Sequence, residues 1–525
     1  MVQPTRYLIL PAQGLQASAS DANSSATKTL IGLAHKAGVA SMRTRLQGVV
    51  QATAKAGAKS AANATAKLKA AGFNFVASLN QDGVKLIEAT PEMIAALRFE
   101  QPGLRAVPEV FYSPAVSIAR IIHRVAKPTA ATPAAVKKLV VTVADSAGNP
   151  VAGVDVVAFT DFANHTGTSG KTSSAGKVTL SVTSSTTYER VYVQHELPGL
   201  WSFLQKNVPT NGAILATLQV LNLATPDSLS FFHTIGGNLN VGKGVKVGVI
   251  DAGIDGTHPD LVVAGGLGCV PGSPENQFGP SGPHGTHVAG IIAGRGSAPN
   301  GVRGIAPGAS LFSYRVFDDT ANSGSSFGIV KAIRQGIADG CDLLNMSLGF
   351  DQDNGPPVVD AAIKDAIAEA NASGVVVIVA AGNDGRKPVS YPGMDDLAIA
   401  VSAIGRKGTF PANSAESGDV VAPFGTDPKN FLAAFSNVGA ALDAAGAGVG
   451  VISTVPGGGH APMSGTSMAC PAVTGVLARL LANNAATLNM RPRDANRANA
   501  IKSLLFAQCQ SLGFGITNEG KGLPE

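Results

Sequence analysis

Cysteine is scarce in this sequence of 525 residues. Its four cysteines, Cys269, Cys341, Cys470 and Cys509, are far apart and form no C-x-x-C pair. Such spacing argues against a zinc site and against a dense disulfide framework. Long apolar runs are also missing, and none approaches the roughly 20 residues of a membrane-spanning helix. We therefore expect no membrane partner, and we assign no cysteine pairing.

Charged residues are few as well. Asp, Glu, Lys and Arg make up 14% of the sequence, and the net charge is +5. Because Lys and Arg form no cluster, we expect no nucleic-acid partner. The sequence is 45% hydrophobic and contains 62 Gly and 31 Pro. This composition indicates a core-forming, turn-rich protein, and the length predicts about two to four domains.

A secretory signal is not visible at the N-terminus. The first ten residues, MVQPTRYLIL, contain no apolar segment of the required length before Pro11 interrupts them. The location therefore stays open between two alternatives. The protein is cytoplasmic if Met1 is the true start, and it is secreted otherwise.

Residues 1–125 are predicted to form a small α+β domain. Extended and helical stretches follow each other in the order β-α-β-β-α-β, with helices over 26–71 and from Thr90 to Phe99. This is the split βαβ, or ferredoxin-like, arrangement. The domain ends in a further extended run over 104–112.

Residues 126–224 are predicted to form a β-sandwich domain. A stretch rich in Ala, Pro and Thr at 126–137 is typical of a linker. Short strands then recur between turn clusters, as expected of a sandwich. The predicted strands are 139–144, 154–160, 177–182, 190–195 and 213–221.

Residues 225–525 show a different pattern, in which buried apolar runs alternate with helices. The alternation predicts an α/β domain with a doubly wound, mostly parallel sheet. In such sheets the functional site lies beyond the carboxyl ends of the strands. The runs are 245–250, 342–346, 375–380 and 397–404, and the helices are 327–338 and 358–372.

Four polar residues stand where such a site is expected. Asp251 ends the first run, His284 opens an apolar helix, and Ser467 lies among small residues before another apolar helix. A carboxylate can hold an imidazole in the tautomer that takes a serine proton. Asn383, at the end of another run, offers a side-chain amide that could stabilise an oxyanion.

The segments around these residues resemble the signature blocks of subtilisin-like serine proteases. They are DAGIDGTHPD from Asp251, HGTHVAG from His284, AGN ending at Asn383, and GTSMA around Ser467. Their order, Asp before His before Ser, is also the subtilisin order. The resemblance covers about residues 226–515. The 126–224 domain is loosely similar to Ig-like or carboxypeptidase-regulatory-like domains.

The resemblance implies a role for each of these positions. Asp251 would orient His284, His284 would act as the general base, and Ser467 would be the nucleophile. Asn383 would bind the oxyanion. The P1 pocket and its edge strand would be formed by Ser347, Leu348, Gly349, Ala380, Ala381 and Gly382.

The expected function is hydrolysis of polypeptides by a serine endopeptidase through an acyl-enzyme. The 1–125 domain resembles an inhibitory propeptide, so we expect an autoprocessed precursor whose propeptide is its intramolecular inhibitor. We expect an apolar P1 side chain and a cut after Phe111 or Tyr112. The alternatives are a peptide ligase or cyclase on the same fold, and a binding scaffold without catalysis.

No cofactor is required by this reading, and we expect no metal site. The one alternative is a structural calcium ion, because Asp260 matches a calcium-binding aspartate of some subtilases. The adjoining loop, 295–302, has one Asn, one Pro and no carboxylate, which favours plain turn residues over calcium ligands. His287 and Cys470 are expected to be packed in the core. Residues 406–430 form an insertion without an assigned role.

Overall fold

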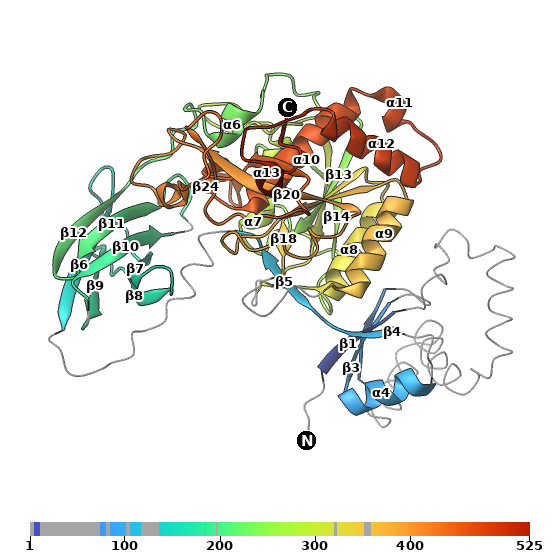
Figure 1. Ribbon diagram of the computed structural model, residues 1–525, viewed down its shortest axis with the longest axis horizontal. Coiled ribbons are helices and arrows are strands. Elements are labelled where there is room, and N and C mark those ends of the chain that lie inside the picture. Colours follow the sequence, from blue (N-terminus) through green and yellow to red (C-terminus); the bar gives the residue numbers. More distant parts are fainter. Residues whose placement is uncertain are drawn as a thin grey trace, which may run out of the picture.

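A computed structural model describes residues 5–10, 74–79, 84–100, 105–116, 136–183, 185–195, 197–319, 323–350 and 359–525. Figure 1 shows three parts: a central α/β body, a β-sandwich on one side, and a small sheet on the other. None of the described helices is long and apolar enough to cross a membrane.

The central body is built on one large sheet, as the sequence predicts. All neighbouring strands are parallel except β20 and β21. The order is β14-β15-β13-β17-β19-β20-β21, and β22 also pairs with β20. The bounds are β13 (Lys246–Asp251), β14 (Val263–Gly268), β15 (Ser310–Arg315), β17 (Leu343–Met346), β19 (Val376–Ala380), β20 (Ala398–Arg406), β21 (Asn430–Leu432) and β22 (Ala444–Ala447).

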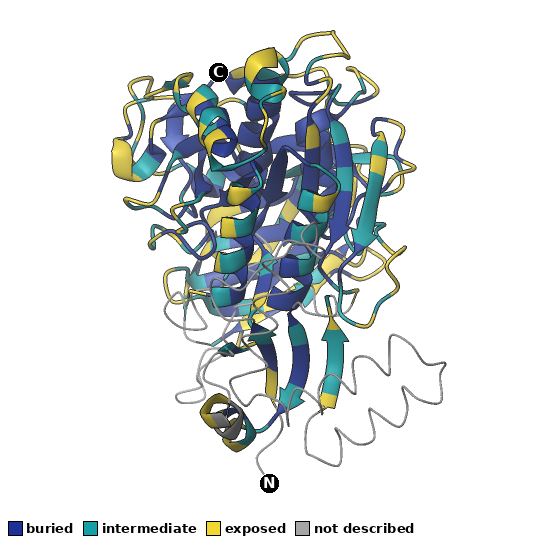
Figure 2. Ribbon diagram, turned by 90° about the vertical axis from the view of Figure 1, so that its right-hand side faces the viewer, coloured by how far each residue is buried: buried dark blue, intermediate teal, exposed yellow. Residues whose placement is uncertain are grey.

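Helices cover both faces of this sheet, so its inner strands are buried on both sides (Figure 2). One apolar cluster joins the sheet to α7 (His284–Ala293), α10 (Thr466–Ala482) and α12 (Ala495–Phe506). A second joins it to α8 (Ser326–Ala338) and α9 (Ala361–Ala372). Helix α9 begins later than the predicted residue 358, because Asp360 caps it by accepting the N–H of Ala362. Strands β14 and β15 were not predicted.

The small sheet contains β1 (Thr5–Leu10), β2 (Asn74–Ser78), β3 (Lys85–Ala89) and β4 (Arg105–Pro108). Its order is β2-β3-β1-β4, and all neighbours are antiparallel. Alternate residues of β1 face opposite sides. Leu8 and Leu10 join the core of α8 and α9, whereas Tyr7 packs with Ile94 of α4 (Pro91–Glu100). The predicted helix over 26–71 lies outside the described residues.

The sandwich consists of two facing sheets with one shared core. The first has the order β11-β10-β7-β8 and the second β12-β6-β9. Strands β8 and β11 were not predicted. The bounds are β6 (Lys137–Asp145), β7 (Asp155–Asp161), β8 (Thr166–Lys171), β9 (Lys177–Val182), β10 (Thr187–Gln194), β11 (Phe203–Pro209) and β12 (Gly212–Leu218).

The sandwich contacts the central body through the 406–430 insertion. The backbone N–H of Leu204 donates to the carbonyl of Asn413 at 2.8 Å, and the N–H of Ala415 donates to Ser202 at 3.1 Å. Ala415, the first residue of the 3-10 helix η3 (Ala415–Asp419), lies in an apolar cluster with Phe159 and Leu204 of the sandwich. The insertion therefore provides a docking surface for the neighbouring domain.

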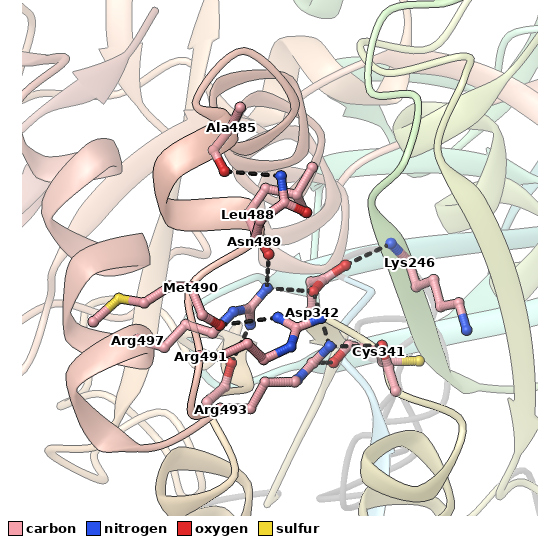
Figure 3. A network of polar contacts seen from close by, with 12 residues as sticks. Lys246, Cys341, Asp342, Ala485, Leu488, Asn489, Met490, Arg491, Arg493 and Arg497 are labelled. Carbon is pink, nitrogen blue, oxygen red and sulfur yellow. Dashed lines mark hydrogen bonds and ion pairs between the residues drawn. The ribbon is translucent and has the colours of Figure 1, made fainter.

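A buried ion-pair network ties the C-terminal helices to the amino ends of the central strands (Figure 3). Arg497 is fully buried, and its guanidinium lies 2.6 Å from Oδ1 of Asp342. The other carboxylate oxygen, Oδ2, accepts the backbone N–H of Lys246 at 2.9 Å. Arg493 lies 3.3 Å from the same carboxylate. One carboxylate thus connects α12 with the starts of β13 and β17.

Replacing Arg497 with Met should destabilise the protein, because Asp342 would stay buried without its closest cation. We expect the free energy of unfolding to fall by about 3–5 kcal/mol, the usual cost of removing one partner of a buried pair. Urea denaturation followed by circular dichroism measures it. Arg491 is the matched control: it is exposed, and among the described residues its side chain bonds the adjacent Met490 carbonyl, so Arg491→Ala should change stability by less than about 0.5 kcal/mol. Equal losses in both variants would contradict the assignment.

Candidate active site

Asp251 and His284 form a buried hydrogen-bonded pair. Asp251 is the last residue of β13, and His284 is the first residue of α7. Nδ1 of His284 lies 2.7 Å from Oδ1 of Asp251, which also accepts the N–H of Ala252 at 2.7 Å. Nε2 of His284 is buried and has no hydrogen-bond partner among the described residues. Nε2 of His284 is therefore the ring nitrogen left for a further hydrogen bond.

Ser467 lies in the first turn of α10, where unpaired backbone N–H groups favour negative charge. Its hydroxyl donates to the backbone carbonyl of Ser347 at 3.0 Å, so in this conformation it is not bonded to His284. The hydroxyl of Ser347 in turn donates to the Ser467 carbonyl at 2.9 Å. The two serines are thus linked reciprocally.

Pro471 explains why the Ser467 carbonyl accepts a side chain. A proline has no N–H to donate to the carbonyl four residues earlier in a helix, and here that carbonyl belongs to Ser467. A buried carbonyl needs a partner, which the Ser347 hydroxyl supplies. Asn345 Nδ2 donates to that hydroxyl at 2.9 Å, and Asn345 Oδ1 accepts from Thr474 at 2.9 Å.

The amide of Asn383 has a fixed orientation. Its Oδ1 accepts the backbone N–H of Thr466 at 2.9 Å and the Thr466 hydroxyl at 2.8 Å. Since a backbone N–H can only donate, the oxygen must face Thr466 and the NH₂ group must face the other way. The NH₂ group therefore points into the site next to Ser467.

A carbonyl from the N-terminal part of the chain occupies this position. The backbone oxygen of Ala115 accepts from the Asn383 amide and from the backbone N–H of Ser467, the latter at 3.3 Å. A Cβ atom on Gly465 would approach this oxygen to 2.4 Å, so only glycine leaves room for it. Two N–H donors that converge on one carbonyl oxygen, with space for that oxygen beside Gly465, are the features of an oxyanion hole.

The segment that delivers Ala115 is β5 (Phe111–Pro114). It lies between two short strands of the central body, β16 (Gly324–Ser325) and β18 (Leu348–Gly349), and pairs antiparallel with both. The N–H of Ala115 also donates to Ser347 at 3.2 Å. The sequence-based expectation that Phe111 or Tyr112 approaches the serine is wrong. Phe111 is 51% exposed and Tyr112 is buried away from Ser467, because the pairing register places Ala115 there.

The remaining predicted substrate-binding residues lie at the carboxyl end of β19 and directly after it. Ala380, Ala381 and Gly382 are buried, and the Ala381 carbonyl accepts the N–H of Ser390 at 2.8 Å. The Ser390 hydroxyl is buried between Gly349 and Gly382, since a Cβ atom on either glycine would come within 2.8 Å of it. The structure therefore brings Gly349 and Gly382, one from each predicted segment, to opposite sides of the Ser390 hydroxyl.

His287 is packed in the core, as predicted. Its Nε2 lies 3.1 Å from the Val451 carbonyl and 3.0 Å from the Ala461 carbonyl. Burial is the main cause that lowers the pKa of His287 to about 3. The ring is therefore neutral at ordinary pH.

Oxygen atoms around Asp260 that could bind a cation already have partners in the protein. Oδ2 of Asp260 already lies 2.8 Å from Nε2 of His460 and accepts the N–H of Val302 at 2.9 Å. The Gly296 carbonyl of the same loop accepts from the guanidinium of Arg303 at 2.7 Å. A divalent ion would compete with both contacts and lie beside a permanent positive charge.

Three residues with clear contacts in the site were not singled out by the sequence. Thr466 orients the Asn383 amide, Asn345 supports Ser347, and Ala115 supplies the bound carbonyl. Pro471, four residues after Ser467, is the one sequence signal that points to an extra partner for a carbonyl. No comparable signal marks Ala115.

Comparison with known sequences bears on the central body. The sequence profile of the Subtilase family matches residues 242–522. Subtilisin NAT from Bacillus subtilis subsp. natto is 39% identical over 263 residues, which are 49% of this chain and 61% of the length of subtilisin NAT. Subtilisin from Bacillus pumilus is 38% identical over 263 residues, covering 49% of this chain and 84% of the relative. Subtilisin Savinase from Lederbergia lenta is 38% identical over 277 residues, covering 53% and 90%.

The range matched by the profile is more than half of the chain and contains Asp251, His284, Asn383 and Ser467. Its sheet and flanking helices are those of the central body described above. By sequence and by fold, this chain belongs to the subtilase family.

Proposed function

We propose that the chain is a serine endopeptidase that acts through an acyl-enzyme. The observation that carries this proposal is the Ala115 carbonyl. The Asn383 amide and the Ser467 N–H both donate to this carbonyl. The same site contains the Asp251–His284 pair. A peptide carbonyl in that position is aligned for attack by the serine hydroxyl.

Each step of the proposed reaction uses one of these contacts. The Ser467 hydroxyl leaves the Ser347 carbonyl and donates to the free Nε2 of His284, which takes its proton as Oγ attacks the peptide carbonyl. Asp251 stabilises the resulting imidazolium. Asn383 and the Ser467 N–H stabilise the oxyanion. His284 then protonates the leaving amine, and water hydrolyses the acyl-enzyme by the same sequence of proton transfers.

We further propose that the N-terminal domain is an intramolecular inhibitor and that it is cut between Ala115 and Val116. Strand β5 fills the cleft as an added strand, the usual way in which an extended peptide binds a sheet edge. The sheet behind it packs on α8 and α9 through Leu8 and Leu10. A cut at this bond leaves the sandwich attached to the central body. Ala115 is apolar, as expected of the P1 side chain, but it is smaller than the Phe111 or Tyr112 side chain that the sequence favoured at P1.

We also propose that the loop beside Asp260 needs no bound cation for its stability. The support is the pairing already described, in which His460 and Arg303 supply the positive groups and hydrogen bonds of the loop. A subtilase of this kind would keep its stability when calcium is removed.

Substituting the triad residues tests the peptidase proposal. Ser467→Ala and His284→Ala should each abolish nearly all hydrolysis of a chromogenic peptide, and the double variant should be scarcely worse, because the groups act together. Asn383→Ala should lower kcat by about 10²–10³ with little change in KM, the cost known for a subtilisin oxyanion asparagine. A raised KM with normal kcat in Asn383→Ala would show instead that the amide binds substrate.

Self-processing tests the proposed cleavage site. The Ser467→Ala chain should remain at 52.9 kDa, whereas the unmodified chain should shorten and begin at Val116 by N-terminal sequencing. Ala115→Pro is expected to block the shortening, because proline cannot donate the N–H that Ala115 gives to Ser347. Ala95→Pro, in the exposed face of α4, tests whether general damage to the N-terminal domain has the same effect. A mature N-terminus beyond Leu221 would contradict the assignment.

Chelation tests the cation proposal. The midpoint of thermal unfolding of the Ser467→Ala chain should be the same, within about 1 °C, in EDTA and in millimolar calcium. Arg303→Ala should lower the midpoint in both solutions, because the Gly296 carbonyl loses its donor. A calcium-dependent rise of several degrees would overturn the proposal.

A further inference from the structure

A carboxylate lies in the largely apolar pocket that holds Tyr112. The Tyr112 side chain is fully buried, and its hydroxyl donates to Oδ2 of Asp360 at 3.2 Å. Burial is the main cause that raises the pKa of Tyr112 well above its usual value, so the hydroxyl keeps its proton and remains a donor. The ring packs in one apolar cluster with side chains that include Phe327, Leu348, Ile363 and Tyr391.

The position of Asp360 explains why one of its oxygens faces this pocket. Asp360 caps α9, and its Oδ1 accepts the backbone N–H of Ala362 at 2.9 Å and of Ile363 at 3.4 Å. Oδ2 is left to face Tyr112. The Ser326 hydroxyl also hydrogen-bonds this carboxylate. The pKa of Asp360 is raised, mainly by burial, and the bonds from the helix N–H groups, Tyr112 and Ser326 oppose this shift. The carboxylate is therefore a buried acceptor that depends on its hydrogen-bond donors.

The pairing register places this pocket within the proposed substrate cleft. Tyr112 pairs with Gly324 of β16, Pro114 pairs with Leu348 of β18, and the Ala115 carbonyl lies at Ser467. With Ala115 at P1, Tyr112 is the P4 residue. Its neighbour Phe111 points outward and is 51% exposed, as alternation along a strand requires. At P4, therefore, the side chain of β5 carries a hydroxyl that donates to the buried Asp360 carboxylate.

We propose that Asp360 is a specificity-determining residue that selects tyrosine over phenylalanine at P4 of peptide substrates. The inference rests on the proposed peptidase function. A site that hydrogen-bonds a substrate hydroxyl rejects the analogue without it, because the buried acceptor loses a partner. Ser326 would keep one bond to the carboxylate, so the preference is modest. Leaving a buried acceptor without a partner corresponds to about 10-fold in affinity for the transition state.

Two chromogenic peptides taken from the chain itself provide the kinetic test. They are succinyl-Tyr-Ser-Pro-Ala and succinyl-Phe-Ser-Pro-Ala p-nitroanilides, hydrolysed by the self-processed protein. We expect kcat/KM to be about 10-fold higher for the tyrosine peptide. In Asp360→Ser, which keeps a capping hydroxyl for α9 but withdraws the carboxylate from the pocket, the ratio should fall to about 1. Equal values of kcat/KM in the unmodified protein would overturn the inference.

Asp494 offers a matched control for the change at a helix cap. It caps α12 by accepting the N–H of Asn496 and Arg497, and it contacts no residue of the cleft among the described residues. Asp494→Ser should therefore leave the tyrosine-to-phenylalanine ratio unchanged. A ratio that falls equally in both variants would mean that helix capping, not recognition of the hydroxyl, sets the preference.

A second measurement separates this inference from the peptidase proposal. In the full-length Ser467→Ala chain, hydrogen exchange of the backbone amides of residues 111–115 reports how firmly β5 is held. Tyr112→Phe should speed this exchange about 10-fold, but not when Asp360 is already Ser. If neither peptide is cleaved while the exchange rates show this coupling, the proposed function fails and recognition of the hydroxyl stands. If both peptides are cleaved equally and the coupling is absent, the peptidase function stands and recognition of the hydroxyl fails.

Discussion

The burial of α10 is the constraint on which the rest of the structure depends. From Thr466 to Ala478 every residue of this helix is buried, and its side chains belong to the same core as α7, α12 and the central strands. A helix enclosed on all sides cannot shift without disturbing the whole body. The Ser467 hydroxyl, the Ser467 N–H and the partner of Asn383 all lie in its first turn. The precision of the site thus derives from the packing of the core.

The cleft beside this helix is bounded by strands that are too short to form a sheet alone. Strands β16 and β18 have two residues each, and β5 joins them into one three-stranded unit. Backbone pairing of this kind accepts many sequences, so discrimination depends on pockets for individual side chains. The enclosed Tyr112 and the fully buried Ala115 occupy such pockets. Under the proposed function, a segment bound in this way both blocks the cleft and is aligned for cleavage.

The sandwich and the Asp260 loop both contact His460. The N–H of Gly199, in the connection between β10 and β11, donates to the carbonyl of His460 at 2.8 Å, and the His460 ring contacts Asp260. His460 belongs to β24 (Gly459–Met463), which pairs with β23 (Val451–Val455). This hairpin leads directly into Gly465 and Ser467. The sandwich therefore rests on elements adjacent to the site, in addition to the 406–430 insertion.

Local patterns in the sequence were sufficient to predict the α/β fold and to bring Asp251, His284, Asn383 and Ser467 forward as candidates. Buried parallel strands are continuous apolar runs, and a residue at the end of such a run must lie at one edge of the sheet. Strands β14 and β15 escaped prediction because glycines and polar residues interrupt their apolar pattern.

Other features were decided only by the tertiary structure. The Ser347–Ser467 link joins residues 120 positions apart, and the Asp360–Tyr112 contact joins residues 248 positions apart. The register of β5 places Ala115, and not Phe111, beside a serine 352 positions away. No local periodicity encodes such distances. A register shift of one residue exchanges buried and exposed side chains, and the register of β5 is set by its pairing with β16 and β18. The sequence thus determined which chemical groups are present, while packing determined which of them meet.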